Sequence, residues 1–155
     1  MGWIAVSGQE NLKLVELDAD EGYHLQDQVG FILRRAQQRH VAIFSSYISD
    51  LTPPQFAALA KLHDVGQVSQ NQLGALIAMD AATVKGVIDR LRARGLVELS
   101  RHEGDRRRLL VSLTEEGNRT VKRLIPLAER ITEETLSPLS PKEIATFLKL
   151  LGKLA

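Results

Sequence analysis

Two helix N-caps that follow each other closely constrain the fold of this chain more than any other feature. Ser69 and Gln72 form an S-x-x-Q capping box, which predicts that a helix begins after Ser69. Asp80 is the next N-cap residue. The inward apolar residues are expected to be Leu73, Leu76 and Ile77 in the first helix and Val84, Val87, Ile88 and Leu91 in the second. The spacing predicts two helices joined by a tight turn, the second of them amphipathic.

The apolar period changes from 3.6 to 2 after Gly95, where the second helix is expected to end. Apolar and polar residues then alternate in two runs, with apolar positions at Val97 and Leu99 and at Leu109, Val111 and Leu113. A polar connection containing Gly104 separates the runs, so they are expected to form a β-hairpin. Two closely joined helices followed by a hairpin make a winged helix-turn-helix, with the hairpin as the wing.

Further helices are predicted on both sides of this unit. Helical spacing predicts a long helix from Tyr23 to about Ile48. Capping residues predict three more helix starts, after Thr52, Thr114 and Ser140. The helix after Thr52 is expected to end before Gly66. The fold class is therefore mainly α with a small β-hairpin wing.

The outermost helices carry more apolar surface than the core of one small winged helix needs. Their stripes are Leu25, Val29 and Ile32 in the first helix and Ile144, Phe147, Leu148 and Leu151 in the last. The simplest partner is a second copy of the chain, which predicts a homodimer. The expected domains are an N-terminal arm (1–22), a dimerisation helix (23–50), a winged helix-turn-helix domain (51–114) and C-terminal dimerisation helices (115–155).

Composition and motifs disfavour an enzyme. None of the 155 residues is cysteine, which excludes disulfides, thiolate metal sites and a cysteine redox switch. No G-x-S-x-G, H-E-x-x-H, P-loop or G-x-G-x-x-G motif occurs. The histidines lack metal-ligand spacing and are His24, His40, His63 and His102. No apolar run approaches the ~18–20 residues of a membrane span, and no secretory signal is present. We expect no catalytic residue, cofactor or metal, no membrane partner, and a soluble cytoplasmic protein.

Basic residues gather in the middle of the chain, although its net charge is only +1. Residues 67–114 hold eight Lys/Arg against five Asp/Glu, whereas residues 1–66 hold five against eight. Three arginines lie together at the tip of the predicted hairpin, namely Arg106, Arg107 and Arg108. They repel one another and have no core to fill, but beside a polyanion each neutralised phosphate releases counterions. The wing is therefore predicted to contact DNA, with at least one arginine bracing the hairpin through Asp105 or Glu103.

The helix after Asp80 is expected to expose one face to solvent, with small or hydrogen-bonding side chains near its start. The residues of this face are Ala82, Thr83, Lys85, Gly86, Asp89 and Arg90. Such a face can enter the major groove of DNA, about 12 Å wide, and reach base edges or phosphates. The start of the preceding helix can add phosphate contacts from Ser69, Gln70 and Asn71. The alternative for these surfaces is an ordinary solvated helix face.

A winged helix that binds only other proteins is the second interpretation of the same pattern. The arginine cluster, together with Thr83 and Lys85, argues against it. Nucleic-acid binding that falls steeply with salt concentration would separate the two interpretations.

Residues from about 24 to 154 resemble the MarR family of bacterial transcription regulators. The resemblance rests on "LTPPQFAALAKL", on "SQNQLGALIAMDAATVKGVIDRLRARGLVELS", and on "DRRRLLVSLTEEG" with its LT-x-x-G entry to the next helix. It implies a homodimer held by the terminal helices, with one winged helix-turn-helix per subunit on a palindromic operator. It also implies that Arg107 or a neighbouring arginine enters the minor groove and that Asp105 orients an arginine. A repressor is the more frequent role in the family, and an activator stays open.

The resemblance further implies a small effector, often phenolic or an aromatic acid, that releases the protein from DNA. Such regulators control aromatic compound catabolism. An anionic aromatic ligand needs a cation and an aromatic-lined cleft. The candidate contacts are Arg39, His40, Phe44, Phe56 and His63. The alternatives are interior hydrogen-bonded roles for the two histidines and an exposed surface charge for Arg39.

Overall fold

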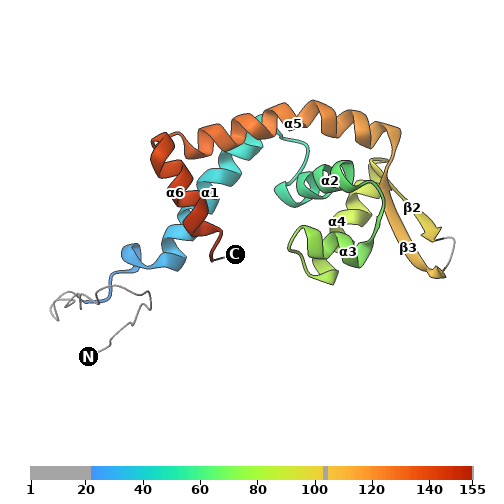
Figure 1. The fold of residues 1–155 in the computed structure, drawn as a ribbon, viewed down its shortest axis with the longest axis horizontal. Helices are drawn as coiled ribbons and strands as arrows, with labels where there is room; N and C mark the ends of the chain where they lie inside the picture. Colours follow the sequence, from blue (N-terminus) through green and yellow to red (C-terminus); the bar gives the residue numbers. More distant parts are fainter. Residues whose placement is uncertain (1–21, 103–104, 155) are drawn as a thin grey trace. The chain divides into compact units, whose positions relative to one another are not determined.

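The computed structural model describes the backbone of residues 22–102 and 105–154, and the side chains of this part except those of residues 102–108. The described part is mostly helical with one small antiparallel sheet (Figure 1). Its elements are η1 (Leu25–Asp27), α1 (Val29–Tyr47), α2 (Pro53–Val65), β1 (Val68–Ser69), α3 (Gln70–Leu76), α4 (Ala81–Ala93), β2 (Val97–His102), β3 (Asp105–Leu113), α5 (Glu115–Leu136) and α6 (Pro141–Leu151). The predicted mainly α winged helix-turn-helix is confirmed.

The chain divides within α1, between residues 37 and 38, into two units that we describe separately. In the described part of the first unit a 3₁₀ turn precedes α1, so the prediction that a long helix starts at Tyr23 is wrong. Gln28 has an extended backbone (ψ 132°), which interrupts helical geometry, and α1 begins only at Val29. The Gln28 side chain donates a hydrogen bond to the carbonyl oxygen of His24 at 3.0 Å and stabilises this turn.

The apolar stripe of the first unit is exposed to solvent in the single chain. The exposed fractions are 50% for Leu25, 65% for Val29 and 52% for Ile32. The Arg35 guanidinium lies 6.0 Å from the centre of the Phe31 ring, a cation–π contact. The predicted arm over residues 1–22 lies outside the described residues except for Gly22.

Local chemistry sets both ends of α2, as predicted. Thr52 Oγ1 accepts a hydrogen bond from the Gln55 N–H at 3.4 Å, and the Gln55 side chain accepts one from the Thr52 N–H at 2.9 Å. At the other end Gly66 has a φ of +79°, a conformation that favours glycine. Its N–H donates to the carbonyl oxygen of Leu62 and so satisfies one of the last carbonyls of the helix.

The predicted helix pair consists of α3 and α4. Ser69 and Gln72 form the predicted capping box of α3. Asp80 caps α4 by accepting a hydrogen bond from the Thr83 N–H at 2.8 Å. The apolar residues predicted to face inward on α4 are all buried, namely Val84, Val87, Ile88 and Leu91. The inner side of α4 is therefore anchored in the core along most of its length.

One apolar residue of α3 does not lie where it was predicted. Leu76 is 48% exposed, whereas Leu73 is fully buried and Ile77 is half-buried. Leu73 and Ile77 are four residues apart and occupy the narrow inward stripe of this short helix, so Leu76 is left at its edge. Gly74 packs beside this stripe against Val84, where a Cβ would lie 3.2 Å from the valine Cγ1.

The sheet has one strand more than predicted. β2 and β3 form the predicted hairpin, and β1 pairs with the other edge of β3 in the order β1-β3-β2. Val111 at the centre lies opposite Leu99 on β2 and opposite Val68 on β1. Val111 and Val97 are buried, whereas Leu109 is 46% exposed. A two-residue strand is too short to show alternation, so no periodicity reveals β1 in the sequence.

One hydrophobic core joins the end of α1 to α2, α3, α4, the sheet and α5. Its fully buried large side chains are Ile48, Leu59, Leu62, Leu73, Val84, Ile88, Leu91, Val97, Val111, Val121, Leu124 and Ile131. Each such side chain contributes about 1.5–3 kcal/mol relative to an exposed one. The outward face of α4 is thereby presented on a rigid support.

The helix α5 begins where the wing ends, at a junction formed by Gly95, Leu96, Thr114 and Gly117. Thr114 Oγ1 accepts a hydrogen bond from the Gly117 N–H at 3.0 Å and donates one to the Gly95 carbonyl oxygen at 2.7 Å. The Thr114 N–H donates to the Leu96 carbonyl oxygen at 3.1 Å. This Thr114 junction connects the end of α4, the base of the hairpin and the start of α5.

The last helix begins at the predicted Ser140–Glu143 capping box, and part of its apolar side is exposed. Phe147 is 40% exposed and Leu148 is 50% exposed. Among the described residues, no helix combines the length and the apolar character needed to cross a bilayer.

Gly117→Ala is expected to destabilise the fold. A Cβ at this position would overlap the carbonyl oxygen of Leu96 and lie 3.3 Å from Cδ2 of Leu113. Overpacking of a tight site costs typically about 1–3 kcal/mol of unfolding free energy, and backbone overlap favours the upper end of that range. Urea unfolding followed by circular dichroism measures the loss.

The matched control is Gly86→Ala on α4, where a Cβ would meet no neighbouring atom within 4 Å. Helix propensity should stabilise this variant by about 0.5–1 kcal/mol. Equal stability of the two alanine variants would show that the close approach at Gly117 does not constrain the junction.

Candidate nucleic-acid interface

The residues predicted to face DNA on α4 lie together on the side opposite its buried stripe. Ala82, Thr83, Lys85 and Arg90 are exposed, and Gly86 is half-buried. Open space over Gly86 leaves the helix backbone accessible from outside. The structure therefore places five of the predicted residues on one accessible helix face.

Asp80 binds Thr83 through both carboxylate oxygens. Oδ1 accepts the Thr83 N–H at 2.8 Å, and Oδ2 accepts the Thr83 hydroxyl at 2.9 Å. These two hydrogen bonds are the main reason why the pKa of Asp80 lies below its ordinary value, because both favour the ionised carboxylate. Asp80 is therefore an anion at neutral pH, and the Thr83 hydroxyl is oriented by it.

The cations of α4 differ in their pairing. Lys85 Nζ lies 2.7 Å from Asp89 Oδ2 one turn further along the helix. Arg90 has no carboxylate partner among the residues whose side chains the structure describes. Exposed ion pairs are weak, so a phosphate can replace Asp89 as the partner of Lys85.

The start of α3 offers less free polar surface than predicted. The Ser69 hydroxyl accepts a hydrogen bond from the Gln72 N–H at 3.3 Å and donates one to Gln72 Oε1 at 2.8 Å. Gln70 is half-buried, and Asn71 is exposed. Asn71 is thus the most accessible of the three predicted phosphate contacts, because the Ser69 hydroxyl already caps the helix.

The structure does not describe the side chains of the predicted wing residues, which are Asp105, Arg106, Arg107 and Arg108. The backbone of β3 begins at Asp105, which lies opposite His102 of β2. The hairpin is therefore established as an element, and the roles of its arginines stay predictions.

A contact that sequence analysis missed ties the end of α4 to the connection between α1 and α2. Arg94 Nη2 donates to Asp50 Oδ2 at 3.1 Å, and Nη1 donates to the Asp50 carbonyl oxygen. Ile48 and Leu51 on either side of Asp50 are buried, which fixes this connection. No sequence spacing relates positions 50 and 94, so only the fold reveals the pair.

Two of the predicted effector contacts form hydrogen bonds with the C-terminal end of α5. Arg39 donates to the carbonyl oxygen of Glu134 at 2.9 Å and to that of Thr135. His40 Nδ1 lies 3.0 Å from Thr135 Oγ1. The Tyr47 hydroxyl, on the same helix, donates to Glu134 Oε2 at 2.8 Å, and this bond raises the pKa of Tyr47.

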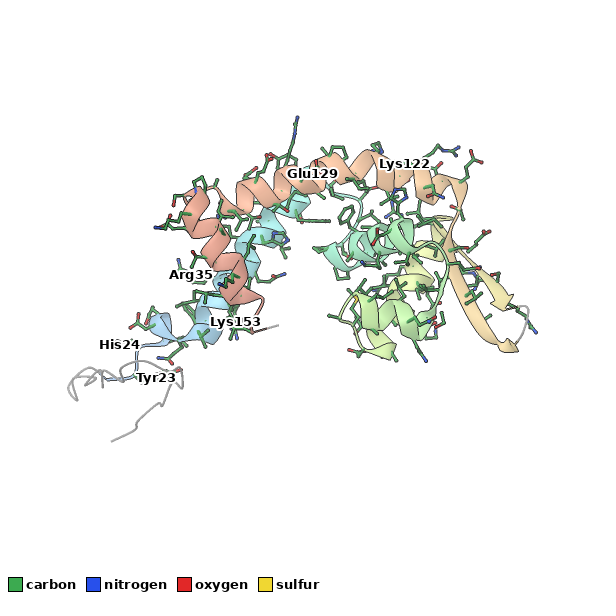
Figure 2. All side chains as sticks on the ribbon, in the orientation of Figure 1. Tyr23, His24, Arg35, Lys122, Glu129 and Lys153 are labelled. Carbon is green, nitrogen blue, oxygen red and sulfur yellow. The ribbon has the colours of Figure 1, made fainter. Side chains whose placement is uncertain are left out.

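The outer side of α5, with Lys122 and Glu129, is exposed to solvent (Figure 2).

The other three predicted contacts lie along α1 and α2. The rings of Phe44 and Phe56 are 6.1 Å apart, and Phe44 is buried whereas Phe56 is half-buried. His63 Nδ1 lies 3.4 Å from Asn118 Oδ1 near the start of α5. His63 also lines an open surface pocket of about 370 Å³ together with Gln67 and other residues of α2, β3 and α5.

The structure does not bring the five predicted effector contacts into one site. His63 faces Asn118, and His40 faces Thr135, 17 positions further along α5. At a rise of about 1.5 Å per residue this separates the two histidines by roughly 25 Å along the helix. One small aromatic acid cannot contact both within a chain.

Comparisons with known proteins agree with the winged helix-turn-helix fold. The model of the MarR family matches residues 49–108. The chain is 43% identical over 134 residues to the HTH-type transcriptional repressor NicR of Pseudomonas putida, and the match covers 85% of each protein.

Two solved structures share both fold and sequence with the chain. A probable transcriptional regulator from Pseudomonas aeruginosa is 48% identical with a TM-score of 0.81, covering 85% of this chain and 100% of that one. BpsR of Bordetella bronchiseptica, whose DNA binding is regulated by 6-hydroxynicotinic acid, is 46% identical with a TM-score of 0.82, covering 86% and 97%. The chain belongs to the MarR family of transcription regulators.

Proposed function

We propose that this protein is a cytoplasmic, homodimeric transcription repressor that binds a specific palindromic operator. The observation that carries this proposal is the exposed face of α4, which bears hydrogen-bonding and cationic side chains on a helix whose other side is buried. Such a face suits the major groove, and the wing suits the adjacent backbone or minor groove. The repressor role follows the name of NicR, and family membership points to regulation rather than catalysis.

The expected domain boundaries become part of this proposal. Residues 23–50 and 115–155 form the dimer, and residues 51–114 bind DNA. The exposed apolar side chains of Val29, Phe147 and Leu148 support a second copy as the partner, because burial of apolar surface is the main driving force of association. Two winged helices related by a two-fold axis would bind two half-sites, so we expect a palindromic operator.

The effector in this proposal is a hydroxylated aromatic acid. BpsR responds to 6-hydroxynicotinic acid and is 46% identical to this chain, which supports a ligand of the same class. In this proposal Arg39 is the cation and His40 the hydrogen-bonding ring, and both exchange their bonds to the end of α5 for bonds to the effector. Phe44 follows His40 by one turn of α1 and contacts Phe56, which makes this pair the candidate aromatic contact. His63 is left out of this site, because it lies roughly 25 Å away along α5.

Arg107→Ala is expected to weaken operator binding and to reduce the slope of log K against log[salt] by about one. The reason is that each phosphate contact releases condensed counterions. Fluorescence anisotropy with a labelled operator at several salt concentrations measures both quantities.

Lys61→Ala is the control for this variant, because Lys61 lies on α2 and pairs with Asp64 at 3.3 Å. It removes the same charge and should leave affinity and slope nearly unchanged. If Arg107→Ala lowers the melting temperature but keeps the wild-type slope, Arg107 braces the hairpin and another arginine contacts DNA.

Leu148→Glu is expected to convert the dimer into monomers. Leu148 is 50% exposed in the single chain, so a carboxylate costs little there, whereas a dimer interface would bury it. Multi-angle light scattering at micromolar concentration should give the mass of two chains for the wild type and of one chain for the variant. Lys149→Glu is the control, because Lys149 is an exposed neighbour of Leu148. This variant should stay dimeric. A wild-type protein with the mass of one chain would disprove the dimer and the palindrome together.

6-Hydroxynicotinic acid is expected to release the protein from its operator at micromolar to millimolar concentration. Cyclohexanecarboxylic acid, which carries the same charge without an aromatic ring, should not. Anisotropy titration of the preformed complex measures the release. No release by any hydroxylated aromatic acid at saturating concentration would refute the effector class and leave DNA binding untouched.

A further inference from the structure

The Thr83 hydroxyl is exposed on the outward face of α4, yet its single proton is already engaged. Thr83 Oγ1 lies 2.9 Å from Asp80 Oδ2, and the Thr83 N–H binds Asp80 Oδ1 at 2.8 Å. An ionised carboxylate only accepts hydrogen bonds, so the hydroxyl must be the donor in this pair. The oxygen of Thr83 therefore has only lone pairs left for any group that approaches from outside.

Base edges in the major groove differ in what they offer to such an acceptor. Adenine presents the N6 amino group and cytosine the N4 amino group, and both donate hydrogen bonds. Guanine presents only the acceptors N7 and O6, and thymine presents the acceptor O4 and a methyl group. A hydroxyl with a free proton would tolerate all four edges, because it can donate as well as accept.

We propose that Asp80 restricts Thr83 to accepting hydrogen bonds, so that the operator has adenine or cytosine at the base that Thr83 faces. This inference rests on the proposed function, since it requires α4 to lie in the major groove. Asp80 is then a positioning residue that determines sequence specificity without contacting DNA itself.

The contacted base is found first. Wild-type protein and Thr83→Val each select binding sites from a random DNA pool, and the selected sites are sequenced. Valine keeps the shape of threonine and removes the hydroxyl. The operator position that loses its base preference in Thr83→Val is the one that Thr83 faces. At this position the wild type should prefer adenine or cytosine over guanine or thymine by about 3- to 10-fold, as expected for one hydrogen bond.

Asp80→Asn then tests the role of the carboxylate. Asparagine caps helices as well as aspartate does, and its Oδ1 can still accept the Thr83 N–H. Its amide group replaces Oδ2 and donates to Thr83 Oγ1, which releases the hydroxyl proton toward DNA. At the same base position, the preference for adenine or cytosine over guanine and thymine should be lost, because the freed hydroxyl can donate as well as accept. A role of Asp80 in helix stability alone would not change which base is selected.

Asp89→Asn is the matched control on the same helix. It also removes one negative charge, but Asp89 contacts Lys85 and not Thr83. It should raise affinity for all sequences and keep the wild-type preference at the Thr83 position. Melting temperatures of all variants establish that α4 is folded.

Binding to chemically modified DNA gives a second measurement, which does not require the Asp80→Asn variant to fold. Replacing the amino group of the selected adenine or cytosine by hydrogen should weaken wild-type binding by about 3- to 10-fold and Thr83→Val binding much less. The proposal is overturned if the wild type selects guanine or thymine there, if Thr83→Val flattens no position, or if Asp80→Asn keeps the wild-type preference. Failure of the wild type to select any sequence would instead refute the proposed function, and this inference with it.

Discussion

The Thr114 junction connects α4 and the hairpin, the candidate DNA-binding elements, to α5. One threonine hydroxyl binds the start of α5 and the Gly95 carbonyl, and the same residue's N–H binds the Leu96 carbonyl. Val97 lies opposite Leu113 directly beside this point, so the hairpin closes where α5 begins. The lack of a side chain at Gly117 lets α5 approach the Leu96 backbone closely. These contacts, together with the shared hydrophobic core, set the direction of α4 and the wing relative to α5.

The candidate DNA surface is largely hydrogen-bonded within itself before any ligand arrives. Asp80 binds Thr83, Lys85 pairs with Asp89, and the Ser69 hydroxyl is engaged by its own capping box. In the proposed complex, a phosphate replaces Asp89 as the partner of Lys85, whereas the Asp80–Thr83 bonds are kept and only the free lone pairs of the Thr83 oxygen meet a base. A surface oriented in this way contributes more to selectivity than to net affinity, since only a site with matching hydrogen-bonding groups satisfies it.

Features that depend on neighbouring residues could be predicted from the sequence, and features that depend on distant residues could not. The caps at Thr52, Ser69 and Asp80 and the buried stripe of α4 need only spacings of three or four residues, and they are confirmed. The strand β1 and the Asp50–Arg94 pair form between segments far apart in sequence, and no local pattern encodes either. The predicted site residues divide in the same way. The outward residues of α4 follow from helical period alone. The effector contacts depend instead on how α1, α2 and α5 pack, which the sequence does not reveal. The sequence therefore groups His40 with His63, although the two side chains face opposite ends of α5.

The pair of Arg94 with Asp50 has a consequence for signal transmission. Because the end of α4 is bonded to the α1–α2 connection and its inner side is buried, we expect α4 to keep its position relative to the core around it. In a dimer of the proposed kind, an effector would then change the distance and angle between the two copies of α4 and leave the surface of each copy unaltered. Operators with altered half-site spacing would therefore distinguish the free state from the effector-bound state, whereas each half-site sequence would be recognised equally in both.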